Sequence, residues 1–170
     1  MDDPEERFTN LYDRHYRNVL GYALLRAEPA MAEDLTSETF LVAWRRLDDL
    51  PDQPLPWLLG VTRNLLRNQR VRRLRSDELI ARLAGLSSFV EGDVAERVTG
   101  RQEALAVLAS LSEQDVEAVV LANWYGLTPA QAAQAAGCSP RTYNVRLHRA
   151  RRRLADALKL PPHFAFQGQP

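Results

Sequence analysis

The sequence has little of what several protein classes need. Its single cysteine, Cys138, excludes an internal disulfide and a thiolate metal cluster. No apolar run approaches the roughly 18 residues of a membrane-spanning helix. The first residues, MDDPEERF, are acidic, whereas a secretory signal begins with basic and then apolar residues. We therefore expect a soluble, cytoplasmic protein.

Signs of catalysis are also missing from the sequence. The three histidines lie far apart, at positions 15, 148 and 163. There is no glycine-rich phosphate loop, HExxH zinc motif or nucleophile motif. We therefore predict that the protein is not an enzyme, and we predict no catalytic residue, metal ligand or cofactor.

The charged residues balance in number but are unevenly distributed. The chain has 22 basic and 22 acidic side chains. Residues 1–60 have a net charge of −6, residues 61–75 of +6, residues 76–120 of −6 and residues 121–170 of +6. A uniformly charged nucleic-acid coat is excluded, but two basic blocks of this kind are typical of local contacts with nucleic acid.

Apolar residues recur at three- and four-residue steps almost throughout, which predicts an all-α fold. We expect helices from Pro4 to near Pro29, from Met31 to Leu47 and from about Pro54 to residue 73. Residues 76 to about 100 are acidic and interrupted by Gly and Ser, and they predict a flexible tether with helical fragments. The alternative is a packed helix of the first domain around Glu78–Leu86. Helices resume near Arg101.

A helix-turn-helix is predicted near the C-terminus. Thr128 and Gln131 form a capping-box pattern, and Gly137 suits the left-handed position that ends a helix. The next helix begins after Ser139 and buries Tyr143 and Leu147. Its opposite side is basic, as a helix in the major groove requires. The alternative is an αα-hairpin with a solvated charged face. That side carries Arg141, Thr142, Asn144, Val145, His148, Arg149 and Arg152.

The predicted helix at 31–47 has apolar residues on two faces. One stripe, expected in the core, contains Phe40, Ala43, Trp44 and Leu47. Either a second protein or the core itself could cover the other face. This other face consists of Asp34, Glu38, Leu41 and Arg45.

The third helix ends in a basic, amide-rich stretch without an acidic residue. Arg63, Arg67 and Arg70 share one stripe, with Asn64 and Asn68 beside them. Arginine and amide side chains suit a nucleic-acid backbone and exposed bases. The alternative is a solvated helix end whose arginines are favoured by the helix dipole.

Three segments resemble extracytoplasmic-function (ECF) sigma factors of the sigma-70 family. Residues 32–44, AEDLTSETFLVAW, resemble the family signature AEDLxQETFLxAW. Residues 56–65, PWLLGVTRNL, resemble the PxxWLxxxARN segment, and residues 145–154, VRLHRARRRL, resemble the SRLHRARxxL ending. These motifs occur in the family's order over most of the chain.

The resemblance implies two small helical domains joined by a flexible acidic linker. Sigma region 2 would span residues 5–75, the linker 76–103 and sigma region 4 residues 104–160. Residues 161–170, PPHFAFQGQP, contain two phenylalanines without a helical period, so we expect a disordered tail, and a docking segment is the alternative. Implied partners are RNA polymerase core, through its largest-subunit clamp and its flap, promoter DNA and an anti-sigma factor.

The resemblance also implies residue roles. The face formed by Asp34, Glu38, Leu41 and Arg45 would dock on the clamp. The −10 element would be held by Asp48, Asp49, Leu50, Asp52 and Gln53 of a base-capturing loop, and by Arg63, Asn64, Arg67, Asn68 and Arg70. At the −35 element, Asn144, Val145, His148 and Arg149 would face bases, and Arg141, Thr142, Arg146 and Arg152 would hold phosphates.

The sequence departs from the family pattern at the second DNA-binding helix. Asn144 replaces the usual Lys or Arg and Val145 replaces Ser, which favours adenine and thymine contacts at these positions. The capture loop lacks an aromatic residue. A stand-alone helix-turn-helix regulator is the alternative function, although it would explain neither the second face of the 31–47 helix nor the arginines between 63 and 75.

Overall fold

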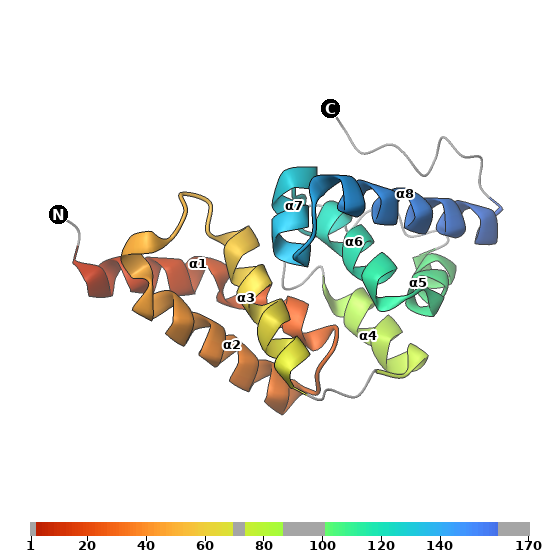
Figure 1. The fold of residues 1–170 in the computed structure, drawn as a ribbon. Coiled ribbons are helices and arrows are strands. Elements are labelled where there is room, and N and C mark those ends of the chain that lie inside the picture. The colour runs from red at the N-terminus through yellow and green to blue at the C-terminus, as the bar shows by residue number, and fades with distance from the viewer. Residues whose placement is uncertain (1–2, 70–73, 87–100, 160–170) are drawn as a thin grey trace. The chain divides into compact units, whose positions relative to one another are not determined.

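The computed structural model describes residues 3–69, 74–86 and 101–159. The helical composition expected from the sequence is confirmed: every regular element in these ranges is a helix (Figure 1). The chain divides between Leu74 and Arg75 into two compact units. The predicted tail at 161–170 lies outside the described residues.

Three helices form the first unit: α1 (Pro4–Leu24), α2 (Pro29–Arg45) and α3 (Leu55–Asn68). A short 3-10 helix, Leu47–Asp49, follows α2. Each α-helix has proline in its first turn, where the missing N–H breaks no helical bond. Val19, Phe40, Ala43 and Leu58 bring all three helices into one buried cluster.

Two threonines add a polar contact inside this apolar core. The hydroxyls of Thr39 on α2 and Thr62 on α3 lie 3.0 Å apart and are fully buried. Each also contacts the carbonyl four residues earlier, at 2.8 Å, so neither hydroxyl lacks a partner. This contact fixes α3 against α2 at mid-helix.

The first unit differs from the sequence prediction at two places. Trp44 was expected in the core stripe, but it is 42% exposed. Its ring packs edge-on against Phe8, with centroids 5.1 Å apart, because α1 covers only part of that side of α2. Helix α3 ends at Asn68, with Gln69 in an extended conformation, and does not continue to residue 73. Arg70 lies outside the described residues.

The second unit contains α4 (Ser76–Leu86), α5 (Arg101–Ser110), α6 (Glu113–Asn123), α7 (Pro129–Ala136) and α8 (Pro140–Ala157). Helices α6, α7 and α8 pack on one another, and α5 packs on both α4 and α8. The core is rich in alanine along α7 and in valine along α6, which allows the three helices to approach closely.

The predicted helix boundaries of the helix-turn-helix are confirmed by their caps. Thr128 and Gln131 form a capping box, with reciprocal hydrogen bonds of 3.0 and 3.3 Å. Gly137 is left-handed, with φ 64°, where a side chain would be strained. Ser139 accepts from the Thr142 backbone N–H at 3.1 Å and starts α8. The turn between α7 and α8 is therefore fixed by local chemistry.

The region expected to be a tether begins with an ordered helix. Leu79, Leu83 and Leu86 of α4 are buried, and α4 packs on α5 of the second unit. The alternative prediction of a packed helix around Glu78–Leu86 is therefore confirmed, but its assignment to the first domain is wrong, because the helix belongs to the second unit. The leucines, spaced three and four residues apart, form the packed face of α4. The sequence prediction gave more weight to Gly85 and the acidic residues, and it therefore expected a tether here. Residues 87–100 lie outside the described residues.

Candidate functional site

Helix α8 exposes a side that is separate from its buried stripe. Tyr143, Leu147 and Ala150 are buried, whereas Val145 is 59% exposed. An exposed valine at the start of a helix is available for contact with a base methyl group. Arg146 is half-buried, and the remaining predicted residues on this side are exposed: Arg141, Thr142, Asn144, His148, Arg149 and Arg152.

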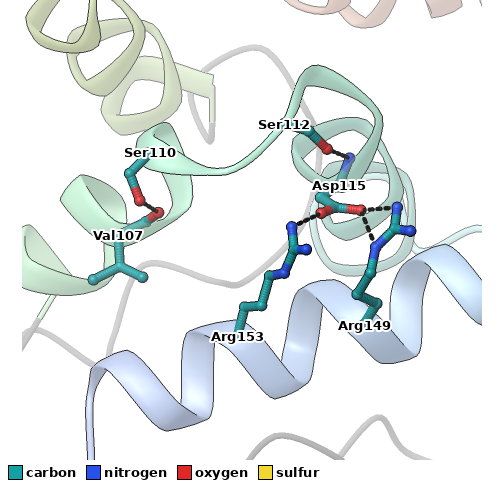
Figure 2. A network of polar contacts seen from close by, with 6 residues as sticks. All are labelled: Val107, Ser110, Ser112, Asp115, Arg149 and Arg153. Carbon is teal, nitrogen blue, oxygen red and sulfur yellow. Dashed lines mark hydrogen bonds and ion pairs between the residues drawn. The ribbon is translucent and has the colours of Figure 1, made fainter.

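Arg149 differs from its predicted role. Its Nε and Nη2 groups both donate to Asp115 Oδ1, at 3.2 and 2.8 Å (Figure 2). Arg153 donates from Nη1 to the other oxygen, Oδ2, at 2.9 Å. The guanidinium expected to face a base is therefore held by a carboxylate from α6.

Asp115 is the centre of this network and was missed in the sequence. Its side chain is fully buried, whereas those of Arg149 and Arg153 are about half exposed. A buried carboxylate requires charged or hydrogen-bonding partners. It also lies in the first turn of α6, where the helix dipole favours negative charge. The signal available in the sequence was an acid three residues after the N-cap Ser112, directly before the largely apolar stretch Val116–Leu121.

A second contact fixes the recognition helix to α6. The Tyr143 hydroxyl donates to the Ala118 carbonyl at 2.7 Å in a buried position. Burial raises the pKa of Tyr143 to about 12, with smaller effects from Arg151, Glu117 and Cys138. Together, Tyr143 and Arg149 hold α8 on α6 at two points that are six residues apart along α8.

The face of α2 that carries Asp34, Glu38, Leu41 and Arg45, which we call the α2 surface, is exposed along its length. Leu41 is 48% exposed, and Asp34, Glu38 and Arg45 around it are exposed. The alternative, in which the core covers both faces of α2, is therefore wrong for this side of the helix. A single exposed leucine is common on protein surfaces, so this exposure leaves the face accessible to a partner without identifying one.

The loop between α2 and α3 is anchored to α1 by Arg7. Its Nη1 donates to Asp48 at 2.8 Å, and its Nη2 donates to the Leu47 carbonyl at 3.0 Å. The predicted loop residues therefore do not act alike. Leu50 packs on the core, whereas Asp49, Asp52 and Gln53 are exposed, and Asp48 is exposed although it pairs with Arg7.

Most of the residues predicted to contact nucleic acid at the basic end of α3 are exposed to solvent. Asn64, Arg67 and Asn68 are exposed, and Arg63 is half-buried. These residues lie on the last two turns of α3, close in sequence to the end of the helix. The structure thus brings together an amide- and arginine-rich surface of the kind that suits nucleic acid.

Two further searches cover only the described ranges. Within residues 3–69, 74–86 and 101–159, no three His, Cys, Asp or Glu side chains gather as metal ligands would. No helix in these ranges has the length and hydropathy needed to cross a membrane.

Comparison with known proteins matches each of the two units to a protein-family model. Residues 11–76 match the family model described as "Sigma-70 region 2", and residues 101–154 match "Sigma-70, region 4". The chain is 31% identical over 162 residues to RNA polymerase sigma factor NccH of Alcaligenes xylosoxydans xylosoxydans, covering 89% of this chain and 87% of NccH. It is 32% identical over 156 residues to ECF RNA polymerase sigma factor SigL of Mycobacterium tuberculosis H37Rv, covering 88% and 87%.

Two solved structures share the fold. One is CnrH in complex with the cytosolic domain of CnrY, with a TM-score of 0.58 and 26% identity over 89% of this chain and 87% of the other. The second is the sigma factor RpoE from Bartonella quintana in complex with the anti-sigma factor NepR. Its TM-score is 0.61, with 25% identity over 89% of this chain and 96% of that one.

The three-helix unit and the helix-turn-helix unit, which match sigma-70 regions 2 and 4, define a transcription initiation factor. The chain belongs to the sigma-70 family of RNA polymerase sigma factors and, within it, to the ECF group. Its function is that of a sigma factor and not that of a stand-alone regulator.

Proposed function

We propose that this protein directs RNA polymerase core to specific promoters through two separate DNA contacts. The second unit binds the −35 duplex with α8, and the first unit captures the melted −10 element with the α2–α3 loop and α3. The observation that carries this proposal is the exposed side of α8, where Val145 is 59% exposed while Tyr143 is buried. The role is one of binding and positioning, without catalysis.

For the −35 element, we assign base contacts to Asn144, Val145 and His148. They are exposed on the first half of α8, the part of a recognition helix that reaches base edges. Arg149 is assigned a different role, because Asp115 already binds its Nε and Nη2 groups. Phosphate contacts are assigned to Arg141, Thr142, Arg146 and Arg152.

For the −10 element, we assign the unpaired strand to the exposed residues of the first unit. Asp49, Asp52 and Gln53 offer acceptors and donors to a flipped base, and Leu50 forms the apolar floor of the loop. Arg7 fixes the start of this loop through Asp48. The α3 residues Arg63, Asn64, Arg67 and Asn68 hold the adjacent backbone, with Arg70 following them in sequence.

The α2 surface is assigned to the polymerase clamp, and the protein would therefore work in the cytoplasm. Its central Leu41 would be covered by the partner, and Asp34, Glu38 and Arg45 would form the charged rim. Relatives of known structure were solved with partners, CnrH with CnrY and RpoE with the anti-sigma factor NepR. By analogy, we propose that an anti-sigma factor binds this chain too.

Run-off transcription tests the proposal. A promoter fragment should give a transcript of defined length only when purified protein and core polymerase are both present. The matched control is the same fragment with its −35 element scrambled, which should lower the yield at least tenfold. Tight binding to the duplex by the protein alone, unchanged by core polymerase, would contradict the proposal and support a stand-alone regulator.

A further inference from the structure

The second unit contains an apolar groove between α5, α6 and the last turns of α8. Its volume is about 310 Å³. Leu105 and Leu108 of α5, Val119 of α6 and Trp124 form its walls, together with Leu154 and Leu158 of α8. At its rim, Arg151 donates to Asn123 Oδ1 at 3.1 Å. A groove of this composition gains free energy when an apolar segment covers it.

The chain leaves α8 directly at this groove. Leu158 lines the groove and is the C-cap of the helix, and Lys159 follows in the left-handed conformation, with φ 53°. Its backbone N–H contacts the Asp156 carbonyl at 3.3 Å. A left-handed residue with this bond is half of a Schellman motif, which reverses the chain at a helix end.

The Schellman motif predicts where the next side chain packs. The residue after the left-handed position commonly contacts the residues three or four before the C-cap. Counted back from Leu158, these are Ala155 and Leu154, and both line the groove. The residue that follows Lys159 is Leu160, an apolar side chain of the required type.

The remaining sequence is suited to such a groove. Residues 160–170, LPPHFAFQGQP, contain two phenylalanines and no Asp, Glu, Lys or Arg. From Lys159, five extended residues span roughly 16 Å. The groove runs along α8 only from Arg151 to Leu158, about 10 Å at 1.5 Å per residue. Phe164 and Phe166 can therefore reach it.

We propose that the C-terminal segment 160–170 folds back into this groove of its own chain. Leu160 packs on Leu154 and Ala155, and Phe164 and Phe166 contact Trp124 and the α5 leucines. The segment belongs to the same chain as the groove, and its short connection to α8 gives it an effective concentration at the groove on the order of millimolar. This favours it over a segment from another molecule. Any apolar helix or peptide that uses this groove must first displace the segment, which makes the segment a built-in competitor. The proposal does not depend on the promoter role.

The test uses ¹⁹F NMR of the full chain with 5-fluorotryptophan at its three tryptophans. Trp124 lines the groove, whereas Trp44 and Trp57 belong to the first unit and serve as internal controls. Resonances are assigned with Trp124→Phe, Trp44→Phe and Trp57→Phe. The double variant Phe164→Ser with Phe166→Ser should shift the Trp124 resonance and increase its H₂O/D₂O solvent shift, leaving the other two unchanged.

Controls separate docking from other causes. Gln167→Ser with Gln169→Ser changes the same segment without removing an apolar anchor and should leave all three resonances in place. A chain that ends at Lys159 should reproduce the Phe double variant and show faster hydrogen exchange in α5. An unmoved Trp124 resonance in the Phe double variant overturns the proposal. A Trp124 shift that depends on protein concentration also overturns it, because the occupant would then be a second copy.

Discussion

Arg149 donates two hydrogen bonds to one oxygen of Asp115, which ties the recognition helix α8 to the first turn of α6. Arg153 occupies the other oxygen, so one buried carboxylate orders two arginines one turn apart (Figure 2). Both guanidinium groups are about half exposed. Asp115 therefore holds both guanidinium groups in place while part of each stays exposed, and a ligand that bound them would cost less side-chain entropy.

Replacing Asp115 with Asn should destabilise the second unit and weaken −35 binding. The change keeps the volume but removes the charge that both arginines contact, and we expect a loss of about 2 kcal/mol in the free energy of unfolding. Urea denaturation measures this loss, and fluorescence anisotropy with a −35 duplex measures the binding. Glu113→Gln, an exposed acid in the same helical turn, should cost less than about 0.5 kcal/mol. Equal effects of the two changes would contradict a structural role for Asp115.

The buried Tyr143 hydroxyl should make the stability of the second unit fall at high pH. Burial raises the folded-state pKa to about 12, above the ordinary value of 10.0. A raised folded pKa means that this contribution is fully present below about pH 10 and is lost as the pH rises toward 12. Tyr143→Phe should lower stability by about 1 kcal/mol at pH 8, through loss of the bond to Ala118.

The pH dependence is the distinguishing measurement for Tyr143. Between pH 9 and 11.5, the stability advantage of the wild-type protein over Tyr143→Phe should shrink and then change sign, because a pKa raised by about two units corresponds to about 2–3 kcal/mol. Tyr125, fully buried with a raised pKa, titrates in the same direction in both proteins and cancels in the difference. Tyr12→Phe, at a ring 38% exposed, is the matched control. A difference that stays constant over this range would show that the hydroxyl is not protected from ionisation.

Local chemistry made the helix-turn-helix predictable. The Thr128–Gln131 capping box, Gly137 and Ser139 each act within a few residues, and the structure contains all three. The periodicity of α8 also placed Tyr143 and Leu147 on its buried side. Such features can be read from sequence because their energies do not depend on distant parts of the chain.

Features that depend on distant partners were harder to predict. The partners of Asp115 lie 34 and 38 residues away in sequence, and no periodicity connects them. The pairing of Arg7 with Asp48 spans 41 residues. Trp44 shares the helical stripe of Phe40, yet it is exposed because burial depends on where α1 stops covering α2. In each case the deciding interaction is tertiary.

The α2 surface should bind RNA polymerase core through Leu41 and Asp34. Changing Asp34→Arg with Leu41→Ala removes the exposed leucine side chain and reverses a rim charge, so we expect at least tenfold weaker pull-down of core polymerase. Circular dichroism should show unchanged helicity, because both positions are exposed. Asp13→Arg, on the exposed side of α1, is the charge-matched control. Normal pull-down by the double variant would exclude this surface as the polymerase contact.

The exposed residues at the start of α8 should determine base preference at the −35 element. Asn144 can form a bidentate contact with adenine and Val145 an apolar contact with a thymine methyl, each worth about 1–3 kcal/mol of discrimination. Each variant should therefore be used in selection from a randomised −35 duplex. Asn144→Ala and Val145→Ala should each change the preference at one base pair, and His148→Ala should change it at a different base pair. Arg152→Ala should instead weaken all sequences alike and reduce the salt dependence of binding by about one counterion. A uniform loss for Asn144→Ala would make Asn144 a phosphate contact, and the reading of bases would then have to come from elsewhere on α8.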